Sequence, residues 1–378
     1  MPGDRPASLG RLLMTADTVG GVWTYALELA RGLSAYEVEV ALATMGAPLT
    51  PAQAAEARCV PRLEVYESQF KLEWMPDPWG EVADAGAWLL GLERRLDPDL
   101  VHLNGYAHAN LPWRVPTLVV GHSCVLSWCE AVKGKPAPRE WNQYRKMVTQ
   151  GLAAASLVVA PSGAMLRALH EHYGPFRAGP VIPNGRALAF EARPKEPFLL
   201  SAGRVWDEGK NIAALDRVAP DLPWTVYVAG ETRPPGGDAI SLPHLYLLGR
   251  LSQEELALWY ARASIYALPA RYEPFGFTAL EAALAGCALV LGDLPSLREV
   301  WGPAATYVPP TDTAALGEAL RELIADEPWR ARMVQAARAR AQEFTPERMV
   351  SGYLEVYRTL LEEAAPRARY DRPRAEAA

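Results

Sequence analysis

The segment RYEPFGFTALE, residues 271–281, follows the apolar run Ile265–Pro269 and leads into a predicted helix. It therefore has the form of a strand, a tight turn and a helix, the unit from which parallel α/β sheets are built. The turn places one carboxylate, Glu273, before Pro-Phe-Gly and a second carboxylate, Glu281, eight residues later. Ligands of open α/β sheets bind at the carboxyl ends of the strands, where this turn lies.

The residues of this turn suit the binding of a sugar and a phosphate. Glu273 can accept hydrogen bonds from sugar hydroxyls, and Glu281, one turn into the helix, can bind both ribose hydroxyls. Gly276, Phe277 and Thr278 present backbone N–H groups at a helix N-terminus, which favours a phosphate or a sugar oxygen. A plainer interpretation is that Thr278 and Glu281 form a capping box, which explains Glu281 but leaves Glu273 unexplained. The acidic pair also allows a glycosidase, but no second such pair lies in a hydrolase-like context.

A second turn of the same kind follows the apolar strand 198–202. It carries Arg204 and, six residues later, Lys210. A guanidinium fork and a compact ammonium together suit a diphosphate, and they would stabilise the charge that develops as a sugar–oxygen bond breaks. The alternative is a pair of solvated cations, which the positive end of a helix disfavours.

Outward from these turns, short apolar strands alternate with helical patterns along the whole chain, which predicts parallel sheets covered by helices. The loop-rich stretch 180–197, with four prolines and an Asn-Gly pair, interrupts the alternation and divides it into two similar halves. The fold class is therefore α/β, with two doubly wound, Rossmann-like domains. The predicted strands are 11–16, 37–44, 62–67, 100–103, 117–120 and 157–160, then 198–202, 225–229, 245–248, 265–268, 288–291 and 306–308. The clearest predicted helices are 21–34, 83–96 and 139–155, then 313–325, 328–343 and 346–364.

The composition narrows the class of function. The chain has 378 residues, a net charge of −6 and four cysteines without CxxC spacing. An acidic chain disfavours a nucleic-acid partner, and the scattered cysteines disfavour zinc and favour a reducing cytosol. No signal peptide or membrane-spanning run is evident, so we expect a cytoplasmic protein. The basic stretch Lys133–Lys146 leaves peripheral contact with the inner face of a membrane open.

The first half carries weaker signals at three strand ends. Gly20 and Gly21 follow the first strand and permit close approach of the backbone to a ligand, ahead of a helix N-terminus. His122 ends the strand 117–120 and could take part in proton traffic or contact a sugar hydroxyl. His102 follows the strand residues Asp99-Leu100-Val101 and is a weaker candidate for the acceptor, with a structural role as the alternative.

Taken together, these motifs resemble the retaining glycosyltransferases of the GT-B fold, family GT4 or glycosyl transferases group 1. Four matches occur in the family's order, over about residues 10 to 360: the glycine-rich first turn, Asn184-Gly185, Gly203-Arg204 with Lys210, and Glu273 to Glu281. The Glu-x7-Glu stretch with its Phe-Gly is fairly specific, whereas the glycine turn alone is weak.

The resemblance implies a function and a set of roles. A hexose would move from a nucleotide-diphosphate sugar, with uridine diphosphate favoured, to a hydroxyl of a glycan, lipid-linked or small-molecule acceptor. Arg204 and Lys210 would hold the diphosphate, Glu281 the ribose, and Glu273 and His122 the donor sugar. Gly20 and Gly21 would lie under the phosphate and acceptor. No metal and no cofactor is expected, and the leaving diphosphate would deprotonate the acceptor hydroxyl.

The resemblance also implies a domain layout. Residues 1–185 would form the acceptor-side domain and 186–345 the donor-side domain. A helix at 346–365 would cross back to the first domain, and 366–378 would be a disordered tail. Two departures from the family pattern are Ser123 after His122, where Asp is frequent, and Arg186-Ala187 after Asn-Gly.

Other functions remain open at this point. The same architecture can serve a nucleotide-sugar epimerase, a phosphorylase or a non-catalytic nucleotide-sugar binder. The nucleotide base, the donor sugar, the acceptor and the oligomeric state are not readable from the sequence.

Overall fold

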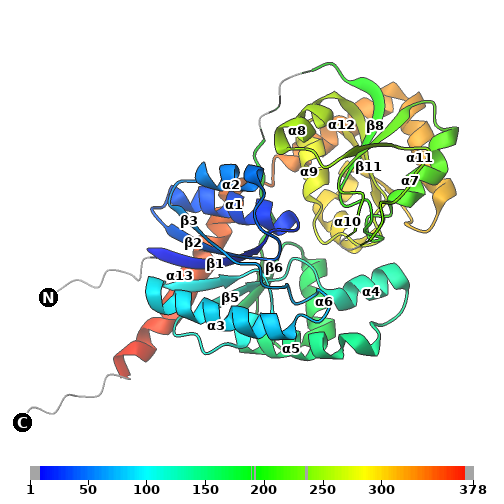
Figure 1. Cartoon of the computed structure of the whole chain (residues 1–378). Coiled ribbons are helices and arrows are strands. Elements are labelled where there is room, and N and C mark those ends of the chain that lie inside the picture. The colour runs from blue at the N-terminus through cyan, green and yellow to red at the C-terminus, as the bar shows by residue number, and fades with distance from the viewer. Residues whose placement is uncertain (1–8, 189, 191–192, 235–236, 371–378) are drawn as a thin grey trace, which may run out of the picture.

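A computed structural model describes residues 9–188, 190, 193–234 and 237–370. It contains two separate parallel β-sheets, each flanked by helices (Figure 1). The predicted strands of both halves are all present, within a residue or two of the expected bounds. The two doubly wound domains predicted from the alternation are therefore confirmed.

The first sheet has seven strands in the order β3-β2-β1-β4-β5-β6-β7, and every neighbouring pair is parallel. The strand order reverses direction between β1 and β4, which is the position where open α/β sheets bind ligands. The strands are β1 (Arg11–Asp17), β2 (Glu39–Met45), β3 (Leu63–Glu67), β4 (Leu100–Leu103), β5 (Thr117–Val120), β6 (Leu157–Ala160) and β7 (Ala178–Val181). The helices are α1 (Gly21–Ser34), α2 (Pro51–Arg58), α3 (Trp79–Leu96), α4 (Val125–Lys133), α5 (Asn142–Ala154) and α6 (Gly163–Tyr173), with the 3₁₀ turns η1 (Ala107–Asn110) and η2 (Arg139–Trp141).

The second sheet has six strands in the order β10-β9-β8-β11-β12-β13, again all parallel, with its reversal between β8 and β11. The strands are β8 (Glu196–Ala202), β9 (Thr225–Ala229), β10 (Tyr246–Gly249), β11 (Ala263–Leu268), β12 (Ala288–Gly292) and β13 (Thr306–Val308). The helices are α7 (Ile212–Val218), α8 (Gln253–Arg262), α9 (Phe277–Leu284), α10 (Pro295–Trp301), α11 (Thr313–Ala325) and α12 (Glu327–Ala341), with the 3₁₀ turns η3 (Ala219–Asp221) and η4 (Gly302–Ala304). The central strands β11 and β12 are buried along their whole length, as expected of a sheet covered on both faces.

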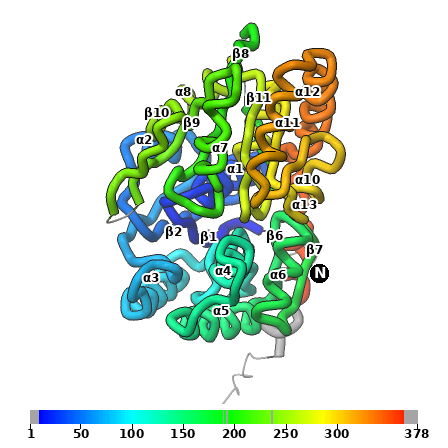
Figure 2. The backbone as a smooth tube through the Cα atoms, turned by 90° about the vertical axis from the view of Figure 1, so that its right-hand side faces the viewer, coloured from blue at the N-terminus to red at the C-terminus, as the bar shows by residue number. Residues whose placement is uncertain are grey.

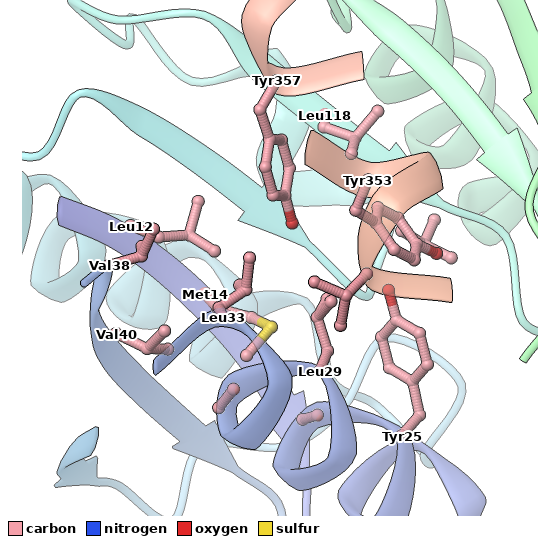
Figure 3. Close-up of a cluster of buried hydrophobic side chains, with 14 of the residues drawn as sticks. Leu12, Met14, Tyr25, Leu29, Leu33, Val38, Val40, Leu118, Tyr353 and Tyr357 are labelled. Carbon is pink, nitrogen blue, oxygen red and sulfur yellow. The ribbon is translucent and has the colours of Figure 1, made fainter. Parts of the chain in front are cut away.

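The last helix, α13 (Pro346–Tyr370), leaves the second domain and packs against the first, as the resemblance implied. Figure 3 shows Tyr353 and Tyr357 of α13 pointing toward β1 and α1. Val350 lies so close to Gly32 of α1 that a Cβ at Gly32 would be 2.3 Å from a Val350 methyl. The helix runs to Tyr370, beyond the predicted end at 365, and the rest of the predicted tail, 371–378, lies outside the described residues.

The chain crosses between the domains twice, and the two crossings touch. Arg186 N donates to Phe344 O at 3.0 Å. A Cβ at Gly185 would lie 2.2 Å from Thr345 O, so this close contact requires a glycine. Figure 2 shows the two domains one above the other, with α10 over α6. The predicted boundaries at 185 and 345 fall in these crossings and remain proposals.

Candidate functional site

The turns of the two domains that the sequence singled out lie on facing sides of the two sheets (Figure 1). Hydrogen bonds and an ion pair between these sides join the domains. Cys124 N donates to Tyr272 Oη at 3.0 Å, and Trp128 Nε1 donates to Asp207 Oδ1 at 3.3 Å. Lys133, the first residue of the predicted basic stretch, pairs with Glu208 at 2.7 Å. The turns that the sequence singled out therefore lie on opposite walls of one site.

Lys210 and Glu273 form the centre of the donor-side wall. Lys210 Nζ lies 2.5 Å from Glu273 Oε2, and both side chains are largely buried. Glu273 Oε1 accepts from Gly276 N at 2.9 Å, which fixes the carboxylate at the start of α9. The structure thus joins the turns after β8 and β11, which the sequence predicted separately.

Arg204 extends from the same wall toward the first domain. Its Nη2 lies 3.0 Å from Asp207 Oδ2, and its guanidinium stacks over the Trp206 ring at 5.2 Å. The side chain is 38% exposed, so it keeps donors for a ligand. A Cβ at Gly20 would be 4.0 Å from Arg204 Nη1, so the cation reaches the glycine turn of the opposite wall.

The N-terminus of α9 also points into the site. Gly276 precedes the helix with φ of +93°, a left-handed conformation that favours glycine. Among the described residues no side chain caps this helix, so the first-turn N–H groups at Phe277 and Thr278 keep their capacity for an anion. The capping box considered as an alternative is wrong, because Thr278 Oγ1 instead accepts from Tyr266 Oη at 2.7 Å.

The glycines of the first domain lie opposite. Gly20 is the residue before α1, and no side chain in the described part of the chain caps that helix either. A Cβ at Gly21 would be 3.7 Å from the Phe277 ring. Phe277 packs against the core of the first domain, so both helix N-termini border the same narrow space.

Glu281 has an unexpected partner. Its Oε1 accepts from Arg186 Nε at 3.0 Å, and Arg186 Nη1 lies 2.5 Å from Glu28 Oε1 on α1. All three side chains are buried. Burial raises the pKa of Glu281, and the Arg186 charge opposes that rise. Arg186, the residue after Asn184-Gly185 that departs from the family pattern, thus supplies ion pairs that join the two domains.

His122 lies on the acceptor-side wall and is only partly buried. Its Nε2 lies 2.8 Å from Asn104 Oδ1, and its ring meets Tyr25 edge-on at 4.5 Å. Asn104 Nδ2 donates to Thr15 O at 2.6 Å, so Oδ1 is the acceptor and His122 Nε2 carries the proton. Burial lowers the pKa of His122 to about 3, which keeps the ring neutral with Nδ1 as its acceptor.

The prediction that His102 contacts an acceptor is wrong. Its side chain is 0% exposed. Tyr25 Oη lies 3.2 Å from its Nε2 and Tyr357 Oη lies 2.6 Å from its Nδ1. His102 therefore links α1, the first sheet and α13, which is the structural role considered as the alternative.

Three polar residues of the acceptor-side wall were not identified from the sequence as functional: Asp17, Glu73 and Asn104. Asp17 ends β1, its Oδ1 accepts from Val19 N at 3.2 Å, and burial raises its pKa while Arg204 opposes the rise. Asp17 and Asn104 follow strands directly, so their positions carried a usable signal. Glu73 lies in a loop without such a signal.

Comparison with known proteins now identifies the family. The model described as Glycosyltransferase Family 4 matches residues 19–190, and the model described as Glycosyl transferases group 1 matches residues 189–340. The chain is a glycosyltransferase of this family. The two matches meet at the first crossing between the domains, so each covers one wall of the site.

Individual relatives agree with this assignment. Glycogen synthase of Mycobacterium tuberculosis is 29% identical over 298 residues, which span 71% of this chain and 70% of that protein. O-antigen chain mannosyltransferase B of Escherichia coli is 28% identical over 173 residues, 46% of this chain. The aligned part spans only 40% of that mannosyltransferase.

Solved structures show the same fold. Sucrose-phosphate synthase from Thermosynechococcus elongatus superposes with a TM-score of 0.79 at 20% identity, over 93% of this glycosyltransferase and 99% of that chain. The Anabaena protein HepE, solved in complex with UDP and glucose, superposes with a TM-score of 0.70 at 17% identity, over 93% of this chain and 100% of that one. These likenesses establish the GT-B arrangement of the two domains.

The described residues of the glycosyltransferase contain no group of three or more His, Cys, Asp or Glu side chains placed to hold a metal ion. In the same part of the chain, no helix has the length and apolar character to cross a bilayer.

Proposed function

We propose that this glycosyltransferase moves a hexose from a nucleotide-diphosphate sugar, with a UDP-sugar favoured, to an acceptor hydroxyl with retention of anomeric configuration. The observation that carries the proposal is the Lys210–Glu273 pair, 2.5 Å apart, beside Arg204 and the N-terminus of α9. Two cations and an uncapped helix N-terminus suit a diphosphate, and the carboxylate between them suits sugar hydroxyls.

The residues around this pair have distinct tasks in the proposed reaction. Arg204 and Lys210 hold the diphosphate and stabilise its charge as the bond to the sugar breaks. Glu273, fixed by the backbone of Gly276, accepts from hydroxyls of the donor sugar. The neutral His122 offers Nδ1 to a hydroxyl of the same sugar, because its Nε2–H is held by Asn104. The leaving diphosphate takes the proton of the attacking acceptor hydroxyl on the same face.

The nucleotide would lie along the second domain, with its ribose at Glu281. That carboxylate accepts from Arg186 at Oε1 and also interacts with the Tyr260 hydroxyl. A carboxylate accepts at about four lone-pair positions, so ribose hydroxyls would use the remaining ones. UDP is favoured because the similarly folded Anabaena protein was solved with UDP and glucose. The contacts between the domains exclude water from the transfer and so limit hydrolysis of the donor.

Thermal unfolding with free UDP, GDP and ADP tests the donor side first. A ligand at a hundred times its Kd stabilises the folded protein by about 2.7 kcal/mol, so we expect a clear rise in Tm with one nucleotide. Arg204→Ala should reduce that rise, whereas Arg217→Ala, an exposed cation of α7 in the same domain, is the matched control.

The anomeric configuration of the product, read by NMR with the matching donor, tests retention. An inverted product would overturn the retaining mechanism. The absence of any nucleotide-dependent rise in Tm would overturn the donor site as a whole. A donor whose sugar changes configuration without transfer would instead identify an epimerase.

A further inference from the structure

The turns after strands β1 to β6 form the acceptor-side wall, and they carry little positive charge. These turns, each taken up to the next helical element, are residues 18–20, 46–50, 68–78, 104–106, 121–124 and 161–162, and Lys71 is the one lysine or arginine among these described residues. Lys71 Nζ already pairs with Glu81, at 3.2 Å. Two carboxylates belong to the same wall, Asp17 at the end of β1 and Glu73 in the turn after β3. This wall is therefore acidic, in contrast to the donor-side wall with Arg204 and Lys210.

Glu73 is positioned by the backbone at the carboxyl end of β4. Its Oε2 accepts from Ala107 N at 2.8 Å and from Tyr106 N at 3.2 Å, whereas Oε1 accepts only from Tyr106 N, at 3.2 Å. A Cβ at Gly105 would be 3.9 Å from Oε1. Gly105 follows Asn104, the partner of His122, so the Glu73 carboxylate lies beside the residues assigned to the donor sugar.

The Glu73 carboxylate has unused hydrogen-bonding capacity. An ionised carboxylate accepts at about four lone-pair positions, and Glu73 forms no ion pair with another described residue that would occupy them. Burial raises the pKa of Glu73 to about 7, because the cost of desolvation exceeds the gain from its backbone donors. The side chain is nevertheless partly exposed, so a ligand hydroxyl can reach it.

We propose that the acceptor is an uncharged polyhydroxylated compound that donates a hydroxyl to Glu73, and that acceptors carrying a phosphate near the reacting hydroxyl are rejected. This inference rests on the proposed function, which reserves Arg204, Lys210 and the N-terminus of α9 for the donor diphosphate. Above pH 7, where Glu73 is ionised, a phosphate on the acceptor would then face the carboxylates of Asp17 and Glu73. Lys71, the one lysine or arginine in the described turns of that wall, is already paired with Glu81. Like charges at such positions strongly disfavour binding.

Matched pairs of acceptors, one uncharged and one phosphorylated, test the proposed acceptor class directly. Inositol and inositol 3-phosphate, glucose and glucose 6-phosphate, and fructose and fructose 6-phosphate are compared with the one donor whose nucleotide raises the Tm. For any pair that reacts, the uncharged member should have a kcat/KM at least about tenfold higher, the scale of one hydrogen bond to a charged group.

Two variants test whether Glu73 causes the expected preference for uncharged acceptors. Glu73→Gln keeps an oxygen for Ala107 N and Tyr106 N but removes the charge. We expect a higher KM for the uncharged acceptor, a smaller effect on kcat, and a smaller ratio between the two members of each pair. Asp77→Asn is the control, because Asp77 is an exposed acid of the same loop at a φ of +46°, which asparagine tolerates; its kinetics should match the wild type. Circular dichroism establishes that both variants are folded.

The outcomes separate this proposal from the proposed function. A wild-type enzyme that is stabilised by a nucleotide, yet reacts equally well with the phosphorylated member of a pair, overturns the acceptor class and leaves the proposed function standing. A folded Glu73→Gln variant with unchanged KM and unchanged selectivity overturns the role of Glu73. A protein that no nucleotide stabilises overturns both proposals.

Discussion

Lys210 Nζ lies 2.5 Å from Glu273 Oε2, although the two residues are 63 positions apart in the chain. Each follows a central strand of the second sheet, β8 or β11, and these strands are hydrogen-bonded neighbours. Parallel pairing brings the two turns to the same edge of the sheet. The pairing places a cation and an anion at the point where, in the proposed reaction, the diphosphate ends and the sugar begins.

Removing the cation of this pair should abolish transfer. We expect Lys210→Ala to lower kcat/KM by about 100-fold or more, the loss typical of one preorganised donor to a developing negative charge. Turnover of donor and acceptor, measured beside the Arg217→Ala control, checks this expectation. Transfer at the wild-type rate in a folded Lys210→Ala variant would contradict the assigned role.

The Arg186 cluster should contribute strongly to stability. Arg186→Met leaves the buried Glu281 without its cation and Glu28 with Arg31 alone, and the loss of one partner of a buried ion pair typically costs about 3–5 kcal/mol. Urea unfolding measures the change, and adding Glu28→Gln to the variant should recover part of it. Arg358→Ala, which breaks an exposed pair with Glu362, should cost less than about 1 kcal/mol. Equal losses for Arg186→Met and Arg358→Ala would show that the buried cluster is not stabilising.

The buried His102 should make the fold sensitive to acid. Burial lowers its pKa to about 3 in the folded chain, against 6.5 for a free imidazole. Between these values the unfolded chain binds a proton that the folded chain does not, so the free energy of unfolding decreases as the pH falls from about 6.5 toward 3. His102→Gln should cost stability at neutral pH, and the cost should shrink in that acidic window.

Melting temperatures from pH 8 to 4 measure this effect. His122, whose pKa is also lowered, is present in both the wild type and the His102→Gln variant. Its contribution to the pH dependence of Tm therefore cancels when the two are compared. His244→Gln, at a half-exposed side chain of the second domain, is the control for the substitution itself. A cost of His102→Gln that does not vary with pH would contradict the assignment.

Gly185 should tolerate no side chain. A Cβ there would lie 2.2 Å from Thr345 O, at the point where the two crossings between the domains touch. Gly185→Ala should therefore lower the Tm by several degrees. Gly80→Ala, at a position where a Cβ meets nothing within 4 Å, should have little effect. A Gly185→Ala protein as stable as the Gly80→Ala protein would show that the crossing can shift at no cost.

The strands and several helices could be predicted from the sequence, because apolar periodicity and turn residues act over short distances. The capping box of Ser252 and Glu255 is present at the start of α8. Helices α2, α4 and α6 and the strand β7 were not predicted. Three of the four residues of β7 are exposed, and the strand lies at the edge of the sheet. It therefore lacks the apolar pattern that identified the other strands.

The residues of the candidate site also fall into those that could be identified from the sequence and those that could not. Glu273, Arg204, Lys210 and His122 were identifiable because each follows a strand in a turn with unusual residue chemistry. His102 has the same local signal as His122, yet one ring is enclosed by Tyr25 and Tyr357 and the other borders the cleft. The difference depends on α13, which reaches His102 from 255 positions away, so local sequence could not decide it.

The sequence by itself determined the alternation of strands and helices, the division into two halves and the residues of the donor-side turns, since these depend on neighbours along the chain. Only the tertiary structure decided that Arg186 joins Glu28 to Glu281, that His102 is structural and that Glu73 borders the cleft. Those pairings connect residues from different elements, up to 158 positions apart in the Arg186 cluster. Their energies depend on burial and on charge partners, which exist only when the two domains and α13 are packed together.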